Sequence, residues 1–129
     1  MRILSKVFLS DQYLEETNVL IVNFSDGTTQ AYDLTQPIPE KMRHVVPIEH
    51  YKLEIEFING EKKQYDMSNR LSGVFSFLND VKKFEQVKLI HDGKAVAWVH
   101  EGKNFDLWTD GLYFHSYPIT DETYEVETL

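Results

Sequence analysis

Histidine and carboxylate side chains near the C-terminus are the residues of this chain best suited to metal chemistry. His100 and Glu101 are adjacent, and His115 follows in the same third of the sequence. Such ligands can form a zinc site without cysteine, and paired strands could bring His100 and His115 together. No His-x-His or His-Glu-x-x-His spacing accompanies them. We therefore predict no metal site, and the alternative function is a metal-binding protein or metal-dependent hydrolase that uses these three residues.

Nucleophilic and phosphate chemistry lack their usual sequence signals. The chain has no cysteine, and none of its serines lies in a Gly-x-Ser-x-Gly elbow. Its six glycines are scattered, so no glycine-rich loop precedes a helix to hold a phosphate. We expect a protein that is not an enzyme and that uses no cofactor.

Two carboxylates, Asp106 and Asp110, flank Trp108 in the sequence. An aromatic neighbour can raise the pKa of a carboxyl group and suit it to acid–base work. Aspartates in turns more often accept hydrogen bonds from nearby amides, and we interpret both residues in that way. Trp108 lies between turn-forming residues and is expected to be partly exposed, as binding anchors are.

The net charge of −8 is concentrated toward the C-terminus, where residues 101–129 hold seven acids and one base. This charge disfavours direct binding to nucleic acid, which requires cations, and it favours a basic protein partner. Acidity can also serve only to keep a small protein in solution. The predicted partner-binding residues are Asp106, Trp108, Asp110 and four residues of an acidic tail at 119–129, namely Asp121, Glu122, Glu125 and Glu127.

The strongest structural signal is a short pattern that occurs twice at an offset of 33. Residues 20–34 and 53–67 each contain an apolar-rich run, an Asp-Gly or Asn-Gly pair, and a second run. These pairs favour type I′ turns, in which both central residues have positive φ, so we predict equivalent β-hairpins over 19–34 and 51–67. In the second hairpin, the alternation predicts that Leu53, Ile55 and Phe57 face the core.

The remaining elements follow from periodicity and from turn residues. We expect a leading strand over 3–9, a polar loop over 11–18 and a proline-rich connection over 35–47. Residues 73–84 have helical spacing, with Ser72 as N-cap and Phe77, Leu78, Val81 and Phe84 buried. A C-terminal hairpin over 86–117 would turn at 91–94 and again at 109–111. The predicted fold is a single α+β domain over 1–118, in which one helix packs on an antiparallel sheet of three hairpins.

Residues 45–115 contain a series of motifs that covers more than half of the chain. The hairpin turn is followed by Tyr65-Asp66-Met67, and the helix has the form Gly-x-Phe-x-x-Leu-x-Asp-x-x-x-Phe from Gly73 to Phe84. Trp98 then precedes a segment of the form Asp-Leu-x-x-Asp-x-Leu-Tyr that ends at Tyr113. This order resembles a small bacterial domain-of-unknown-function family associated with predicted antitoxins. The family pattern has a proline after the tryptophan, where this chain has Val99, and it lacks the extra N-terminal hairpin.

The resemblance implies a compact α+β fold with a regulatory role and supplies no catalytic residues. Together with the charge, it predicts a non-catalytic acidic binding or inhibitory protein of bacterial or phage origin. Such a protein would occupy a basic surface of a nucleic-acid-handling partner, as an antitoxin-like protein or a phage anti-defence inhibitor would. The N-terminus does not read as a signal peptide, and no apolar run has the length of a membrane span, so we expect no membrane contact and a cytoplasmic location. A structural oligomer that pairs exposed sheet edges is a third class of function.

Overall fold

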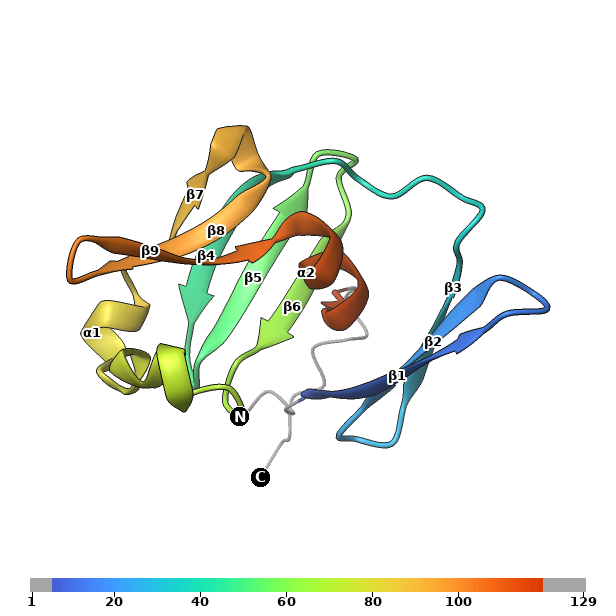
Figure 1. Cartoon of the computed structure of the whole chain (residues 1–129), viewed down its shortest axis with the longest axis horizontal. Coiled ribbons are helices and arrows are strands. Elements are labelled where there is room, and N and C mark those ends of the chain that lie inside the picture. The colour runs from blue at the N-terminus through green and yellow to red at the C-terminus, as the bar shows by residue number, and fades with distance from the viewer. Residues whose placement is uncertain (1–5, 120–129) are drawn as a thin grey trace, which may run out of the picture.

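Short antiparallel strands dominate the computed structural model, which describes residues 6–119 (Figure 1). The strands are β1 (Phe8–Leu14), β2 (Val19–Phe24), β3 (Thr29–Asp33), β4 (Met42–Ile48), β5 (Lys52–Phe57), β6 (Lys62–Asp66), β7 (Lys88–Ile90), β8 (Ala95–His100), β9 (Lys103–Trp108) and β10 (Tyr117–Pro118). The helices are the 3-10 helices η1 (Gly73–Asn79) and η2 (His91–Gly93) and the α-helices α1 (Val81–Phe84) and α2 (Thr109–His115). The result is a small α+β fold, as predicted.

The strands form three separate sheets, so the prediction of one continuous sheet is wrong. Their orders are β1-β2-β3, β10-β6-β5-β4 and β7-β8-β9, and every pairing is antiparallel. Figure 1 shows β7–β9 crossing over β4–β6, while β1–β3 stand to one side beyond α2. We call β1–β3 the first meander and β4–β6 the second meander.

The second meander carries most of the core. Leu53, Ile55 and Phe57 are fully buried, as predicted from their alternation. They belong to one apolar cluster with the buried side chains Leu78, Phe84, Val96, Trp98 and Leu112. Burial of this inward row fixes the register of β5, because a slip of one residue would send the row to solvent.

The first meander begins with an edge strand that lies farther along the chain than the strand predicted over 3–9, of which residues 3–5 are outside the described part. Residues 11–14, which we expected in a loop, continue β1 to Leu14 and pair with β2. Nearly all of β1 is exposed. An exposed edge strand needs no apolar alternation, and so its polar sequence resembled that of a loop.

The two predicted hairpin turns form three-residue loops. Gly27 and Gly60 have φ of 87° and 92°, which confirms their predicted positive φ. Asp26 and Asn59 do not have positive φ, so the predicted type I′ geometry is wrong. One hydrogen bond closes each loop. The Phe24 amide donates to the Thr28 carbonyl oxygen at 3.0 Å, and the Phe57 amide donates to the Glu61 carbonyl oxygen at 2.8 Å. The pattern matches a type I turn followed by a glycine bulge.

A two-residue type I′ turn occurs instead between β8 and β9. Glu101 and Gly102 have φ of 52° and 75°, and the flanking residues His100 and Lys103 are paired. Side-chain chemistry explains the difference from the first two hairpins. Asp26 and Asn59 each accept a hydrogen bond from the amide two residues later, at 3.0 Å in both cases. This Asx-type bond stabilises the longer loop.

The predicted helix over 73–84 is divided into two pieces. Asp80 has extended φ and ψ of −75° and 108°, and its side chain accepts from the Lys82 amide at 3.1 Å to cap α1. Ser72 precedes η1 but makes no side-chain capping bond, in contrast to the prediction.

The break at Asp80 changes which apolar side chains are buried. Phe75, Leu78 and Phe84 are buried, Phe77 is partly buried, and Val81 is 54% exposed. In a 3-10 helix, residues three apart lie above one another, so Phe75 and Leu78 share a face. The predicted burial is therefore confirmed for Leu78 and Phe84 and wrong for Val81.

The C-terminal segment contains a helix in place of the predicted final strand. The hairpin from Lys88 to His100 forms with η2 at its turn, as predicted. After β9, the Thr109 amide and hydroxyl both donate to the Lys94 carbonyl oxygen, at 2.9 and 2.6 Å, and α2 begins there. Helical geometry buries Leu112 and Tyr113 together, which an exposed strand at this position would not do.

Candidate functional site

Trp108 lies at the end of β9, directly before α2, and its side chain is 47% exposed. This confirms the predicted partial exposure. The indole ring stacks on His91, with 5.2 Å between the centroids and an interplanar angle of 13°. His91 itself sits in the η2 turn with a φ of 52°. A turn from the neighbouring hairpin thus supports one of the largest exposed aromatic groups of the described chain.

Asp106 and Trp108 point to the same side of β9, because alternate residues of a strand share a face. Their cross-strand partners are Ala97 and Ala95, both fully buried. The intervening Leu107 packs against the core on the opposite side. Asp106 and Trp108 therefore lie two residues apart on one face of a strand, and the interpretation of Asp106 as a turn residue is wrong.

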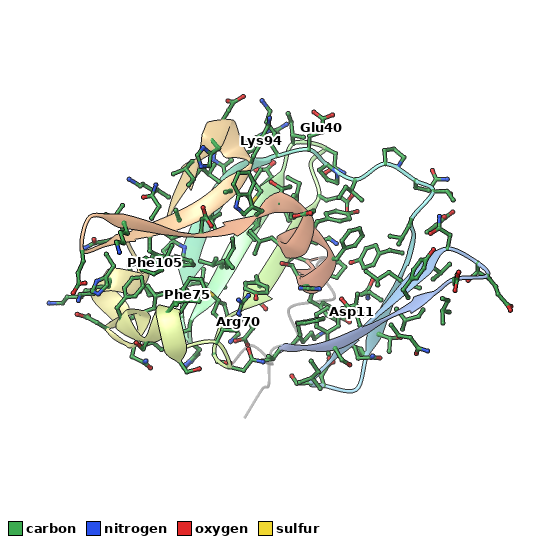
Figure 2. The ribbon with its side chains drawn as sticks, in the orientation of Figure 1. Asp11, Glu40, Arg70, Phe75, Lys94 and Phe105 are labelled. Carbon is green, nitrogen blue, oxygen red and sulfur yellow. The ribbon has the colours of Figure 1, made fainter. Side chains whose placement is uncertain are left out.

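A hollow of about 270 Å³ adjoins Trp108 and includes Asp110. Its other walls come from the connection before β4, from the residue just before β8 and from the start of α2: Ile38, Pro39, Glu40, Lys94 and Thr109. Figure 2 shows Glu40 and Lys94 at the same end of the molecule. Asp110 accepts a hydrogen bond from the Gly111 amide at 2.8 Å, which agrees with its interpretation as a residue that binds a neighbouring amide.

Trp108 also borders a second, smaller hollow of about 60 Å³. Tyr65, Arg70 and His115 supply its polar groups. Arg70 donates to the Tyr65 hydroxyl oxygen at 2.8 Å, and His115 lies 3.0 Å from an Asp11 carboxylate oxygen. These groups therefore already have partners within the chain, whereas the larger hollow is the more open of the two.

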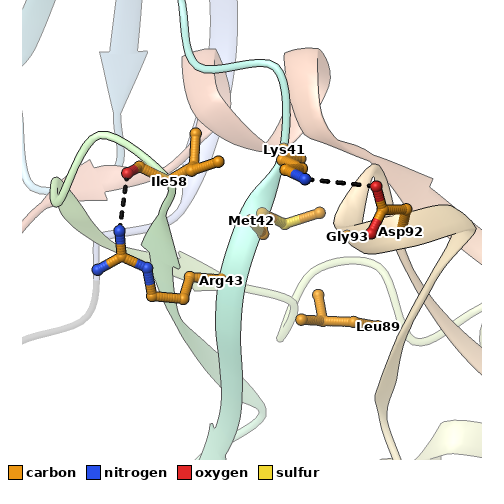
Figure 3. Close-up of a pocket in the computed structure, with 7 residues that line it drawn as sticks. All are labelled: Lys41, Met42, Arg43, Ile58, Leu89, Asp92 and Gly93. Atoms are coloured by element: carbon orange, nitrogen blue, oxygen red, sulfur yellow. Dashed lines mark hydrogen bonds and ion pairs between the residues drawn. The ribbon is translucent and has the colours of Figure 1, made fainter.

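The largest of these surface hollows, about 420 Å³, lies between β4 and the η2 turn (Figure 3). Its cations have partners: Lys41 is 3.3 Å from Asp92, and Arg43 contacts Glu56 at 3.3 Å and the Ile58 carbonyl oxygen at 2.9 Å. A Cβ on Gly93 would collide with the carbonyl oxygen of Met42, so only glycine lets η2 touch β4 here. Among the described residues that line this hollow, neither cation is free to bind a ligand, and we assign the hollow no role.

A buried lysine, which the sequence did not reveal as special, joins the two meanders. Lys63 is 1% exposed, and its ammonium nitrogen donates to the Tyr32 hydroxyl oxygen and to the Tyr113 carbonyl oxygen, both at 2.7 Å. The same nitrogen lies 3.6 Å from the centroid of the Tyr113 ring. The Tyr113 hydroxyl donates to Glu61 at 3.0 Å. The one sequence feature that could have indicated its burial is the spacing of Lys63 two residues from Tyr65, which places both side chains on the inward face of β6.

Burial changes the acid–base properties of this group. It lowers the pKa of Lys63 to about 8, an effect that nearby Glu61 partly opposes. Burial and the hydrogen bond to Glu61 raise the pKa of Tyr113 to about 12, and burial also raises the pKa of Tyr32. A lysine with a strongly shifted pKa can indicate a catalytic site, but Lys63 lines none of the hollows described above. We interpret it as a structural contact between the meanders.

The three candidate metal ligands do not come together. His100 stacks on Phe77 at 4.3 Å and lies 3.8 Å from Glu101, whereas His115 stacks on Phe8 at 3.7 Å and contacts Asp11. Paired strands do not bring His100 and His115 together, because His115 ends a helix. Within residues 6–119, no group of three or more histidine, aspartate and glutamate residues is placed to hold a metal ion.

The predicted tail residues Asp121, Glu122, Glu125 and Glu127 lie outside the described residues. Among the described helices, none combines the length and the apolar character needed to cross a membrane. Comparison with family models, curated proteins and solved structures finds no match to the chain. The resemblance to the antitoxin-associated family therefore stays a prediction.

Proposed function

We propose that the protein is a non-catalytic, acidic binding protein that docks on a basic surface of a larger nucleic-acid-handling protein. The observation that carries this proposal is the half-exposed Trp108 beside an open hollow with Asp110 in its wall. Tryptophan is enriched among the residues that dominate the energy of protein interfaces. The stacking of Trp108 on His91 holds the indole in place before a partner arrives, which reduces the entropy lost on binding.

The charge of the chain supports a basic partner. With a net charge of −8, the protein attracts cationic surfaces and accelerates encounter with them. A surface that binds nucleic acid through lysine and arginine is such a target. By covering it, an acidic protein would inhibit its partner through competition with phosphate, without any chemical step.

The biological setting follows from the resemblance over residues 45–115. We propose a bacterial or phage protein of the cytoplasm, acting as an antitoxin-like protein or as a phage anti-defence inhibitor. Both roles use the same physical mechanism, namely occupation of a basic site. The two roles differ in the origin of the partner. An antitoxin-like protein binds a partner encoded by a neighbouring gene, whereas a phage inhibitor binds a protein of the infected bacterium.

We also propose that the two meanders are an internal repeat, with the first added to a complete domain. The bounds of β5 and β6 equal those of β2 and β3 advanced by 33 residues. The backbone hydrogen bonds at the open ends of the two hairpins are also equivalent. The Leu34 amide donates to the Asn18 carbonyl oxygen at 3.0 Å, and the Met67 amide donates to the Tyr51 carbonyl oxygen at 2.8 Å. This supports a common origin, because turn and closure geometry repeat together.

The function can be tested by capture followed by competition. Immobilised protein is used to capture partners from a bacterial lysate, and the strongest basic partner is purified. Its affinity is then measured at about 0.05 M and about 0.3 M salt, with and without the nucleic acid that it binds. The proposal requires weaker binding at high salt and displacement by nucleic acid. Binding that is insensitive to both would contradict it.

A further inference from the structure

We propose that the hollow of about 270 Å³ beside Trp108 receives an arginine side chain of the partner. This inference rests on the proposed function and specifies how the partner is recognised. Three features of the hollow lead to it: an exposed aromatic group, two carboxylates that form no ion pair within the described chain, and a single competing cation. Each feature makes a separate contribution that a variant can test.

The first feature is the indole of Trp108. Tryptophan attracts cations more strongly than the other aromatic residues do, through the negative face of its ring. The ring is 47% exposed and is fixed by its stacking on His91. A guanidinium group is planar and weakly hydrated, so it stacks on an indole at a lower desolvation cost than an ammonium group.

The second feature is the pair of carboxylates in the same hollow, Glu40 and Asp110. Both side chains are exposed, and within residues 6–119 neither forms an ion pair. They come from different elements, one from the connection before β4 and one from α2. The several donors of a guanidinium group can reach two such acceptors together while the plane of the group rests on the indole.

The third feature is Lys94, the one cation among the described residues that line the hollow. Its side chain is exposed, and it opposes the entry of another positive charge. Removing this charge should therefore strengthen the binding of arginine. A gain of affinity is a discriminating outcome, because damage to the fold would produce only losses.

The test uses a dye-labelled hexa-arginine peptide and the matched hexa-citrulline peptide, in which each guanidinium is replaced by a neutral urea of nearly the same shape. Fluorescence anisotropy gives the affinity of the full chain for each peptide. The variant Glu40→Gln/Asp110→Asn removes the two carboxylates of the hollow. Its control, Glu15→Gln/Glu16→Gln, removes the same charge from an exposed turn of the first meander. The variant Lys94→Gln has Lys83→Gln, on α1, as its control.

We expect hexa-arginine to bind at least about tenfold more tightly than hexa-citrulline, as a charge stacked on tryptophan and paired with carboxylates should. Glu40→Gln/Asp110→Asn should weaken hexa-arginine about tenfold, and Lys94→Gln should strengthen it about threefold. Each control should change affinity by less than about twofold, because distant exposed charges are screened. Thermal midpoints close to that of the natural chain would show that the variants fold.

Three outcomes distinguish a failure of the arginine site from a failure of the proposed function. If the controls change affinity as much as the hollow variants do, the arginine site is wrong while a general attraction to basic partners stands. If hexa-citrulline binds as tightly as hexa-arginine, the arginine site is likewise overturned. In the third outcome, the hollow variants change hexa-arginine affinity as expected while the affinity of the captured partner is unchanged by salt and by nucleic acid. In that case the proposed function fails and the arginine site stands.

Discussion

The ammonium nitrogen of Lys63 lies 2.7 Å from the hydroxyl oxygen of Tyr32, and this contact ties the second meander to the first. The charge is almost wholly buried, which is costly unless its hydrogen bonds are satisfied. The Tyr113 carbonyl oxygen and the Tyr113 ring provide two more favourable contacts. The junction between the meanders is therefore sensitive to the protonation of one lysine.

We predict that the free energy of unfolding rises between about pH 8 and pH 10. Folding lowers the pKa of Lys63 from 10.5 to about 8. In this window the native lysine has released a proton that the unfolded chain still holds, so higher pH favours the native state. The rise should be roughly 2–3 kcal/mol at most. Above pH 10 the trend should reverse, because the pKa of native Tyr113 is raised to about 12 and the unfolded tyrosine ionises first.

Urea denaturation at a series of pH values measures this dependence. Lys63→Met should remove the rise, and Lys62→Met, which replaces an exposed lysine on the same strand, should keep it. A rise of equal size in the Lys63→Met protein would assign the effect to another group.

We expect Phe84→Ala to cost roughly 3–5 kcal/mol of stability, as the truncation of a large core aromatic does. Phe84 is 1% exposed, its ring lies 5.9 Å from that of Trp98, and its carbonyl oxygen accepts the Trp98 indole hydrogen bond at 2.9 Å. Val81→Ala, in the same short helix, should change stability by less than about 0.5 kcal/mol because Val81 is exposed. Guanidinium denaturation of both proteins decides whether the helix is oriented as described.

Two glycine substitutions should separate backbone strain from steric collision. Gly60 has a φ of 92°, and the space that an added Cβ would occupy is open, so Gly60→Ala should cost about 1–2 kcal/mol from its left-handed backbone alone. Gly93 has a φ of 85°, and a Cβ at this position would also strike the Met42 carbonyl oxygen. Gly93→Ala should therefore cost more than about 3 kcal/mol. Equal losses in thermal denaturation would show that η2 can move away from β4.

Local patterns predicted the hairpins well because each depends on neighbouring residues. The alternation of Leu53, Ile55 and Phe57 correctly predicted their burial, and Gly27 and Gly60 correctly predicted the positions of the turns. Turn type was not predictable from the Asp-Gly and Asn-Gly pairs, since side-chain bonds two residues onward favour the longer loop.

Features set by contacts distant in sequence were missed. The α2 helix forms because Thr109 bonds to Lys94 and because Leu112 reaches the core, and neither contact is visible in a local window. Lys63 looks like a surface residue until Tyr32 and Tyr113 are placed around it. Trp108 was identified correctly as exposed, but its support by His91 and the contribution of Glu40 to the hollow required the fold.

The acidic tail should govern how fast the partner binds. Changing Asp121, Glu122, Glu125 and Glu127 to lysine reverses four charges and should slow association by about tenfold or more at low salt, because steering depends on long-range attraction. Surface plasmon resonance with the captured partner measures the rate directly. The same change should have little effect at about 0.5 M salt, where charges are screened. An unchanged association rate at low salt would remove the tail from the mechanism.

Trp108 should govern how long the complex lasts. Trp108→Ala removes an aromatic anchor that is desolvated only in the complex, so dissociation should accelerate about tenfold or more while the association rate stays within about twofold. Trp108→Phe should recover part of the residence time, because it keeps a ring that can stack on His91. Val99→Ala, which trims another exposed apolar side chain of the same hairpin, is the matched control and should leave both rates unchanged. If Trp108→Ala dissociates at the natural rate, the partner binds elsewhere, and the exposed edge strand β1 becomes the next surface to test.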